Sequence, residues 1–306
     1  MASDLSIPGP LDHGPLDHGP AGGEELTAWR TAGFWRQARR FARHWGAVFG
    51  LVFVVVVALA ALLAPVLTPY GPTEFTADAL QGPSRSHPFG TDELGRDVLT
   101  RVLYGARISP GVGVLAIGLA GAIGTALGLI AGYARGVLDA VVMRAMDILL
   151  AFPGILLAIV IVATLGPGLR NAMFAVGIAF IPTFARVVRG DVLVEREKEY
   201  VSAARVLGAS GVRIAFREIL PGVLGPVIVL ATLGVAGAIL AAAGLSFLGL
   251  GAEPPTAEWG AMLSEGRNYL PDYWWIAVFP GSAIALTVLG INLIGDGLRD
   301  TLDPRL

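Results

Sequence analysis

The sequence predicts an all-α integral membrane protein with six membrane-spanning helices. Hydrophobic residues make up 54% of the chain and charged residues only 15%, and the apolar residues are collected into long blocks. About 20 apolar residues are needed to cross roughly 30 Å of hydrocarbon. Blocks of this length indicate that lipid is the solvent for most of the chain. Cysteine is absent, which excludes disulfides, thiolate metal sites and a thiol nucleophile.

Two segments precede the first apolar block. Residues 1–28 are rich in glycine and proline and repeat the sequence PLDHG in tandem, which predicts a disordered cytoplasmic tail. The two histidines of the repeat favour a plain tail over a metal site. Residues 29–46 place aromatic residues and alanines at helical spacing with arginines mostly on other faces, which predicts an amphipathic helix in the membrane interface.

Six blocks form the expected membrane domain, 47–306. The first is an uninterrupted apolar stretch, and the second is rich in glycine and alanine, which lets helices approach closely. The third is expected to extend toward Val137, with Asp147 near the interface, and the fourth to end where Arg186 reaches the interface. The fifth is too long for one untilted span and contains Pro221 and Pro226, so a kinked helix is expected. The sixth begins beside an aromatic belt. The predicted spans are 47–67, 109–133, 148–165, 172–188, 219–250 and 274–294.

The distribution of positive charge predicts the orientation. With the N-terminus inside, the inner segments hold 16 of the lysines and arginines and the outer segments hold 6. By the positive-inside rule, both termini and the polar segment 186–218 face the cytoplasm. The outer segment 84–107 carries four arginines, for which Asp92, Glu93 and Asp97 are the expected partners, and it is expected to lie flat on the membrane surface.

Missing motifs exclude several kinds of membrane protein. All four histidines lie outside the spans and no HExxH occurs, so neither a serine–histidine intramembrane hydrolase nor a zinc peptidase is supported. Lys198 is the only lysine and lies between two glutamates, so the chain has no Walker A motif for ATP hydrolysis. The span centres carry no charge in this assignment, which disfavours a proton- or sodium-coupled carrier.

The polar segment 186–218 is several times longer than a simple connector requires. Within it, Tyr200, Ala203, Ala204 and Leu207 follow i, i+3, i+4 and i+7 spacing, and Gly208 is a helix-stop signal. The pattern predicts a short helix between two spans. Taken alone, it favours an amphipathic connector on the inner leaflet over a rigid docking element.

A resemblance to a known family favours the docking element. The stretch AARVLGASGVRIAFREILP resembles the EAA loop of bacterial ABC importer permeases, with matches at Ala203, Ala204, Gly208, Leu220 and Pro221. Serine replaces the motif's glutamate at 202, and glutamate replaces its isoleucine at 218. The blocks 87–109, 131–159, 244–263 and 274–304 are similar to the dipeptide/oligopeptide/nickel permease group, and within it to the C-type subunit.

The resemblance implies a six-helix type I ABC importer permease bundle with a cytoplasmic coupling helix. It implies a multi-pass protein of the bacterial cytoplasmic (inner) membrane that forms half of a peptide pathway and is not itself an enzyme. The implied partners are membrane lipid, a second (B-type) permease subunit, two ATP-binding subunits that hold ATP and Mg, and an extracytoplasmic substrate-binding protein. No nucleic acid, catalytic residue, metal or cofactor is expected in this chain. The expected ATPase-coupling residues are Tyr200, Val201, Ala203, Ala204, Arg205, Leu207 and Gly208.

Prolines within or beside the spans are the candidates for shaping the pathway, because proline kinks helices. They are Pro153, Pro182, Pro226 and Pro280, and a packing kink is an equal alternative at each. Two other classes of function stay open on the residues alone: a secondary carrier or channel without an ATPase partner, and a membrane enzyme or scaffold. Peptide, nickel-chelate, opine and sugar carriers share these motifs, so the substrate is not fixed by them.

Overall fold

The computed structural model describes residues 41–76 and 78–302. The expected tail 1–28 and most of the expected interfacial helix 29–46 lie outside the described residues. Of that helix, residues 41–43 are helical, and the first long helix, α2, begins at Trp45.

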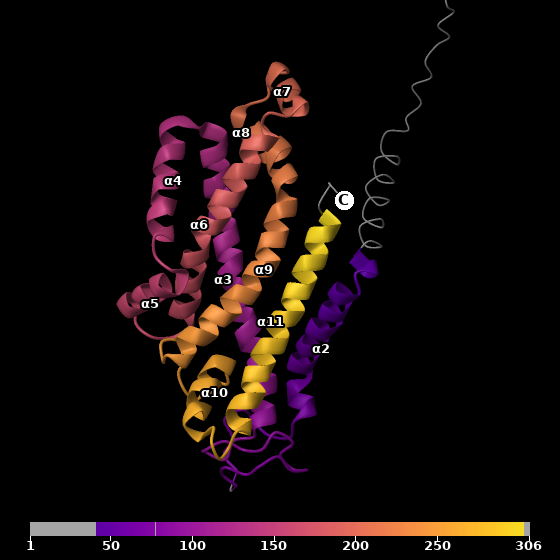
Figure 1. Cartoon of the computed structure of the whole chain (residues 1–306), viewed down its shortest axis with the longest axis vertical. Coiled ribbons are helices and arrows are strands. Elements are labelled where there is room, and N and C mark those ends of the chain that lie inside the picture. Colours follow the sequence, from indigo (N-terminus) through magenta and orange to yellow (C-terminus); the bar gives the residue numbers. More distant parts are fainter. Residues whose placement is uncertain (1–40, 77, 303–306) are drawn as a thin grey trace, which may run out of the picture. The chain divides into compact units, whose positions relative to one another are not determined.

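Long helices form the body of the protein (Figure 1). Five are long and apolar enough to cross a membrane, and a sixth crossing results if a pair bent by 91° is one span, counted over the described residues. The long helices are α2 (Trp45–Leu67), α3 (Val98–Ala134), α6 (Leu169–Glu195), α9 (Leu220–Phe247) and α11 (Trp275–Leu302), and the bent pair is α4 (Gly136–Leu150) with α5 (Gly154–Leu165).

Short elements connect them. A connector helix, α7 (Glu199–Val206), lies beyond the end of α6, and α8 (Gly211–Arg213) and η1 (Ile214–Ile219) lead from it into α9. At the other end of the bundle, α10 (Trp259–Gly266) and η2 (Arg267–Tyr269) precede α11 (Figure 1).

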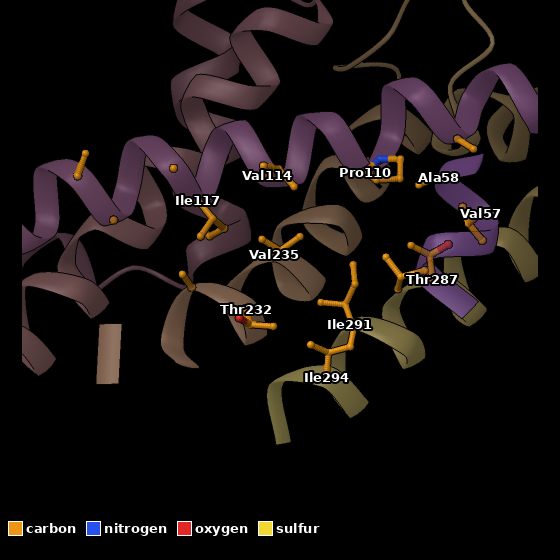
Figure 2. Close-up of a pocket in the computed structure, with 16 residues that line it drawn as sticks. Val57, Ala58, Pro110, Val114, Ile117, Thr232, Val235, Thr287, Ile291 and Ile294 are labelled. Carbon is orange, nitrogen blue, oxygen red and sulfur yellow. The ribbon is translucent and has the colours of Figure 1, made fainter. Parts of the chain in front are cut away.

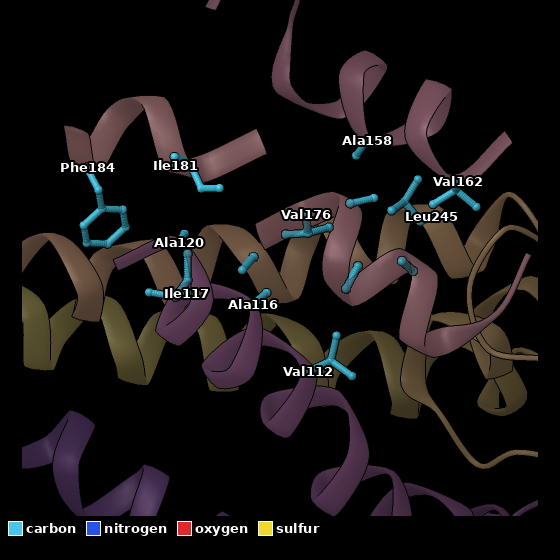
Figure 3. Packing of buried hydrophobic residues seen from close by; sticks show 14 of the residues in the cluster. Val112, Ala116, Ile117, Ala120, Ala158, Val162, Val176, Ile181, Phe184 and Leu245 are labelled. Atoms are coloured by element: carbon cyan, nitrogen blue, oxygen red, sulfur yellow. The ribbon is translucent and has the colours of Figure 1, made fainter. Parts of the chain in front are cut away.

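Small residues allow the central helices to pack closely. A Cβ on Gly128 of α3 would lie 2.6 Å from the carbonyl oxygen of Ala185 in α6, and one on Gly50 of α2 would lie 2.5 Å from that of Gly290 in α11. Such distances are shorter than real contacts allow, so only glycine permits these helix pairs to approach. The main core lies between α3, α5, α6 and α9, where Ile117, Val176 and Phe184 are buried (Figure 3).

The bent pair differs from the expected third span, 148–165. The helix begins at Gly136, and it breaks between Leu150 and Gly154, where Pro153 forms the N-cap of α5. Proline has no N–H to donate and restricts the residue before it, so the chain starts a new helix at this point.

The expected fourth span, 172–188, is longer in the structure. Helix α6 continues to Glu195, so Arg186 lies within the helix and the connector is shorter than the polar segment 186–218. Arg189 donates two hydrogen bonds to Asp139 of α4, at 2.5 and 2.7 Å, and Arg196 donates to the carbonyl oxygens of Gly132 and Tyr133 at 3.1 and 2.9 Å. These contacts compensate the charged end of the helix.

The second and fifth spans also differ from expectation. Helix α3 begins at Val98, eleven residues before the expected start, because Asp97 caps it by accepting a hydrogen bond from the Thr100 N–H at 2.7 Å. Pro221 lies in the first turn of α9, where a missing N–H costs nothing, so it does not break the helix.

The segment before α3 is a compact ion-pair cluster. Arg96 and Arg101, each 1% exposed, share a carboxylate oxygen of Glu265 at 3.0 Å, and the Arg96 Nε lies 2.6 Å from Asp92. Glu93 also pairs with Arg96, at 3.3 Å, and burial raises its pKa. Asp97 pairs with His87 at 2.9 Å instead of with an arginine. Arg96 and Arg101, two of the four arginines of segment 84–107, are therefore compensated within the fold.

Candidate functional site

Helix α7 is held against the long helices by one fully buried side chain. Val201 is 0% exposed and packs in a cluster with Val188 and Val192 of α6 and Ile214 and Ile219 of η1. Val201 stays a predicted coupling residue, but its side chain is covered by its own chain and does not form part of the exposed surface. Its role is to anchor the helix.

A polar contact fixes the start of α7. The Tyr200 hydroxyl donates to a carboxylate oxygen of Glu195 and, at 3.3 Å, to the carbonyl oxygen of Glu218. The second carboxylate oxygen of Glu195 lies 2.7 Å from Lys198 Nζ. Burial and the bond to Glu195 raise the pKa of Tyr200 to about 12. The phenol therefore stays protonated at physiological pH and links α6, α7 and the segment before α9.

The end of α7 is a Schellman motif. The Gly208 N–H donates to Arg205 O and the Ala209 N–H donates to Ala204 O, each at 3.1 Å. Gly208 has φ +79°, and a Cβ placed there would meet no atom within 4 Å. Glycine is therefore required by the backbone conformation and not by lack of space.

Apolar side chains are exposed at the tip of α7 and on the segment that follows it. Val206 and Leu207 are 87% and 86% exposed, and Arg205 and Ala203 are exposed beside them. Val212 and Phe216, at 71% and 61%, lie exposed on the segment that follows. Exposed apolar side chains gathered on a short, anchored helix indicate a protein-binding surface. We call Val206, Leu207, Val212 and Phe216 the apolar tip.

The predicted coupling residues separate into two groups. Val201 is buried and Ala204 is partly covered, whereas Tyr200, Ala203, Arg205, Leu207 and Gly208 are exposed. Val206, Val212 and Phe216 are also exposed but were not among the predicted coupling residues, because the expected face was chosen by spacing from Tyr200. The available signal was the set of four large apolar residues around the helix stop. Two lie directly before Gly208 and two lie after it.

The four candidate prolines do not gather around one cavity. Pro153 and Pro226 are exposed, while Pro182 and Pro280 are buried. None of them lines either of the two cavities described between the helices. A role for these prolines in a pathway stays a prediction.

The larger cavity is a groove of about 600 Å³ between α2, α3, α9 and α11 (Figure 2). Its lining is apolar apart from the hydroxyls of Thr232 and Thr287, and Pro110 of α3 contributes to it. In the described part of the chain, no three histidine or carboxylate side chains gather into a metal-binding group.

The architecture defines a class of protein: a multi-pass membrane bundle with an anchored helix that presents an apolar tip beyond the spans. Comparison with known proteins makes this specific. Residues 124–306 match the family model described as the binding-protein-dependent transport system inner membrane component, and residues 33–83 match the N-terminal TM domain of oligopeptide transport permease C. The chain belongs to this family of transport permeases.

Curated relatives agree with the family. The chain is 54% identical over 230 residues to the dipeptide transport system permease protein DppC of Alkalihalophilus pseudofirmus, which covers 75% of this chain and 76% of the relative. It is 48% identical over 282 residues to the glutathione transport system permease protein GsiD of Pectobacterium atrosepticum, covering 92% of each. This protein is therefore a multi-pass inner membrane permease subunit of an ATP-driven importer, and ATP hydrolysis belongs to other subunits.

Proposed function

We propose that this chain forms half of a peptide pathway across the bacterial inner membrane, and that α7 couples this pathway to ATPase subunits. The implied complex contains a second permease subunit, two ATP-binding subunits that hold ATP and Mg, and an extracytoplasmic substrate-binding protein. Support for a peptide substrate comes from the relatives, whose names specify dipeptide and glutathione transport.

One observation carries the coupling proposal: the apolar tip is exposed while its helix is fixed. Leu207 is 86% exposed, yet Val201, one turn and a half away, is 0% exposed and the Tyr200 hydroxyl binds Glu195. A partner that pushes on the tip therefore moves α6 and the start of α9 with it. Rigid-body transmission of this kind is a recognised way of switching a transporter between two states.

The charge distribution supports a cytoplasmic position for α7. The segments on the side that would hold α7 and both termini contain 16 lysines and arginines, and the segments on the opposite side contain 6. ATP-binding subunits reach the complex from the cytoplasm, so the proposed docking surface and its partner lie on the same side.

Substitution of the tip tests the proposal. In the complete complex purified through a tag on this chain, Val206→Asp with Leu207→Asp is expected to release the ATP-binding subunits and abolish peptide-stimulated ATP hydrolysis. Two charges then lie on a surface that docking must desolvate. Ser202→Asp is the matched control, since Ser202 is exposed on the same helix but lies outside the apolar tip. Retention of the ATP-binding subunits by the double variant would disprove docking at this surface.

A further inference from the structure

A strip of charged side chains lies across α4 and α6. Arg186 donates to Asp147 at 2.7 Å, with the two side chains 57% and 53% exposed, and Arg189 binds Asp139 one turn closer to α7. Arg144 lies exposed on α4, one turn from Asp147. We call these five residues the α4–α6 charged strip. From the sequence, Asp147 is expected near the interface, whereas α4 begins eleven residues before it.

Apolar surface surrounds the exposed ion pair on both sides. Toward the break between α4 and α5, Ile148 is 58% and Phe152 is 56% exposed, and toward the α7 end, Val141 is 61% and Val194 is 67% exposed. Arg186 lies nine residues before the end of α6, which corresponds to about 14 Å along the helix axis. An exposed ion pair that is flanked by apolar surface on both sides is costly to leave against hydrocarbon. It therefore faces water or a polar partner.

Helix α4 has a face that its own chain does not cover. All 15 residues of α4 are described, and Met146 alone among them is buried. Arg144 and Asp147 share one exposed stripe with Ala140 and Ala151, at i, i+4, i+7 and i+11 spacing from Ala140. Helix α4 runs from near the α7 end of the bundle to the break before α5 (Figure 1), and the stripe follows one of its faces. It is polar or small throughout, whereas the neighbouring stripe of Val137, Val141 and Ile148 is apolar.

We propose that the α4–α6 charged strip lines the water-filled path and binds the two charged ends of a zwitterionic peptide in passage. Arg186 takes the carboxylate and Asp147 takes the ammonium group. This inference rests on the proposed peptide-import function and names where that substrate binds.

Exchange of partners explains why a pair of opposite charges suits this task. Without peptide, Arg186 and Asp147 neutralise each other across 2.7 Å. When a zwitterion enters, each side chain replaces its protein partner by one end of the peptide, so the number of compensated charges is unchanged. The guanidinium matches a carboxylate in two parallel hydrogen bonds. Binding of this kind is favourable enough for entry and weak enough for release, as a pathway requires.

Thiol labelling tests whether the strip faces water. The chain has no cysteine, so single cysteines at Ala140 and Ala151 report on the stripe, and cysteines at Val141 and Ile148 are matched controls on the same helix. The assembled permease pair in lipid nanodiscs is treated with the charged reagent MTSET, and labelling is scored by the mass of this chain. Only a thiolate reacts, and a thiolate needs water. We expect Ala140→Cys and Ala151→Cys to react at least tenfold faster than the controls. Equal rates at the four positions would overturn the water-filled path.

Protection by a peptide tests the ligand. Alanyl-alanine is expected to slow the labelling of Ala151→Cys at least threefold, whereas N-acetylalaninamide, which lacks both charges, leaves the rate unchanged. Arg186→Gln is expected to abolish the protection. Arg135→Gln is the matched control, since Arg135 also binds a carboxylate, that of Glu197, at 2.7 Å on an exposed surface, and protection should persist in it.

The outcomes separate this inference from the proposed function. Absence of protection by alanyl-alanine, or equal protection by the uncharged analogue, would overturn the binding of peptide ends. Slower labelling caused by anionic lipid in the nanodisc, with no effect of peptide, would assign the strip to lipid headgroups instead. ATP-driven peptide uptake by the complete wild-type complex in liposomes is measured in parallel, and its presence would keep the proposed function when the labelling result is negative.

Discussion

Replacement of Gly208 isolates the contribution of one backbone conformation to coupling. Gly208 has φ +79°, and a Cβ there would meet no atom within 4 Å, so a substitution introduces no clash with a neighbour. The cost is the conformational penalty of a left-handed residue, about 1–2 kcal/mol for alanine. That cost raises the population in which the Schellman motif is open by a factor of about 5–30. Valine should cost more because its side chain is branched at Cβ, and asparagine less because it tolerates this region.

The series Gly208→Asn, Gly208→Ala and Gly208→Val should therefore show graded effects. Peptide-stimulated ATP hydrolysis in the reconstituted complex is expected to fall in that order, and hydrogen exchange of the Ala209 amide, which donates to Ala204 O, to accelerate in the same order. Membrane insertion should be unchanged, since α7 lies outside the long apolar helices. If the alanine and valine variants showed wild-type hydrogen exchange at Ala209 and wild-type ATP hydrolysis, the proposed role of Gly208 would be refuted. The same holds if the asparagine variant were as impaired as the valine variant.

Three further predictions follow from other contacts. Tyr200→Phe removes the hydroxyl that binds Glu195, so peptide uptake per ATP hydrolysed should fall while Val201 keeps the helix in place; unchanged coupling would remove the contact from the mechanism. Glu265→Gln takes away the carboxylate shared by two buried arginines, and should lower stability by about 3–5 kcal/mol, seen as a lower melting temperature, whereas an unchanged melt would mean that the cluster is compensated otherwise. Single cysteines at Ser210 and Asn268, both exposed, should be labelled by an impermeant reagent in intact cells only at Asn268, and labelling at Ser210 would reverse the orientation.

The long helices and the stop of α7 were predictable because strong local signals determine them. Uninterrupted apolar blocks specify membrane helices whatever they pack against. The expected number of spans, six, matches the described residues when α4 and α5 are counted as one span. Gly208 ends α7 where the sequence predicts, since glycine after a helical repeat favours a left-handed cap.

The break between α4 and α5 and the pairing of Arg186 with Asp147 were not predictable in the same way. The sequence of an apolar block in lipid does not show which face of its helix packs against protein. A residue that faces lipid and one that faces another helix are equally apolar. Arg186 was expected to mark the end of its span because a lone charge belongs at the interface. Its partner Asp147 is 39 residues earlier in the chain, and only the packing of α4 on α6 brings the two together.

The same reason explains why the sequence did not show that Val201 is buried. In an eight-residue helix with apolar residues on several faces, spacing alone does not show which face the long helices cover. The ends of α6 and η1 together create the apolar cavity that Val201 fills. The exposed tip is what remains outside it.

Photo-cross-linking from position 207 tests the central claim most directly. A photoreactive amino acid replaces Leu207, which is 86% exposed at the tip of α7, and the complete complex is irradiated in membranes with and without ATP. The account predicts a cross-link from this chain to an ATP-binding subunit, with a yield that changes when ATP is added. Cross-links only to lipid or to the second permease subunit would contradict the assignment of α7 as the coupling helix.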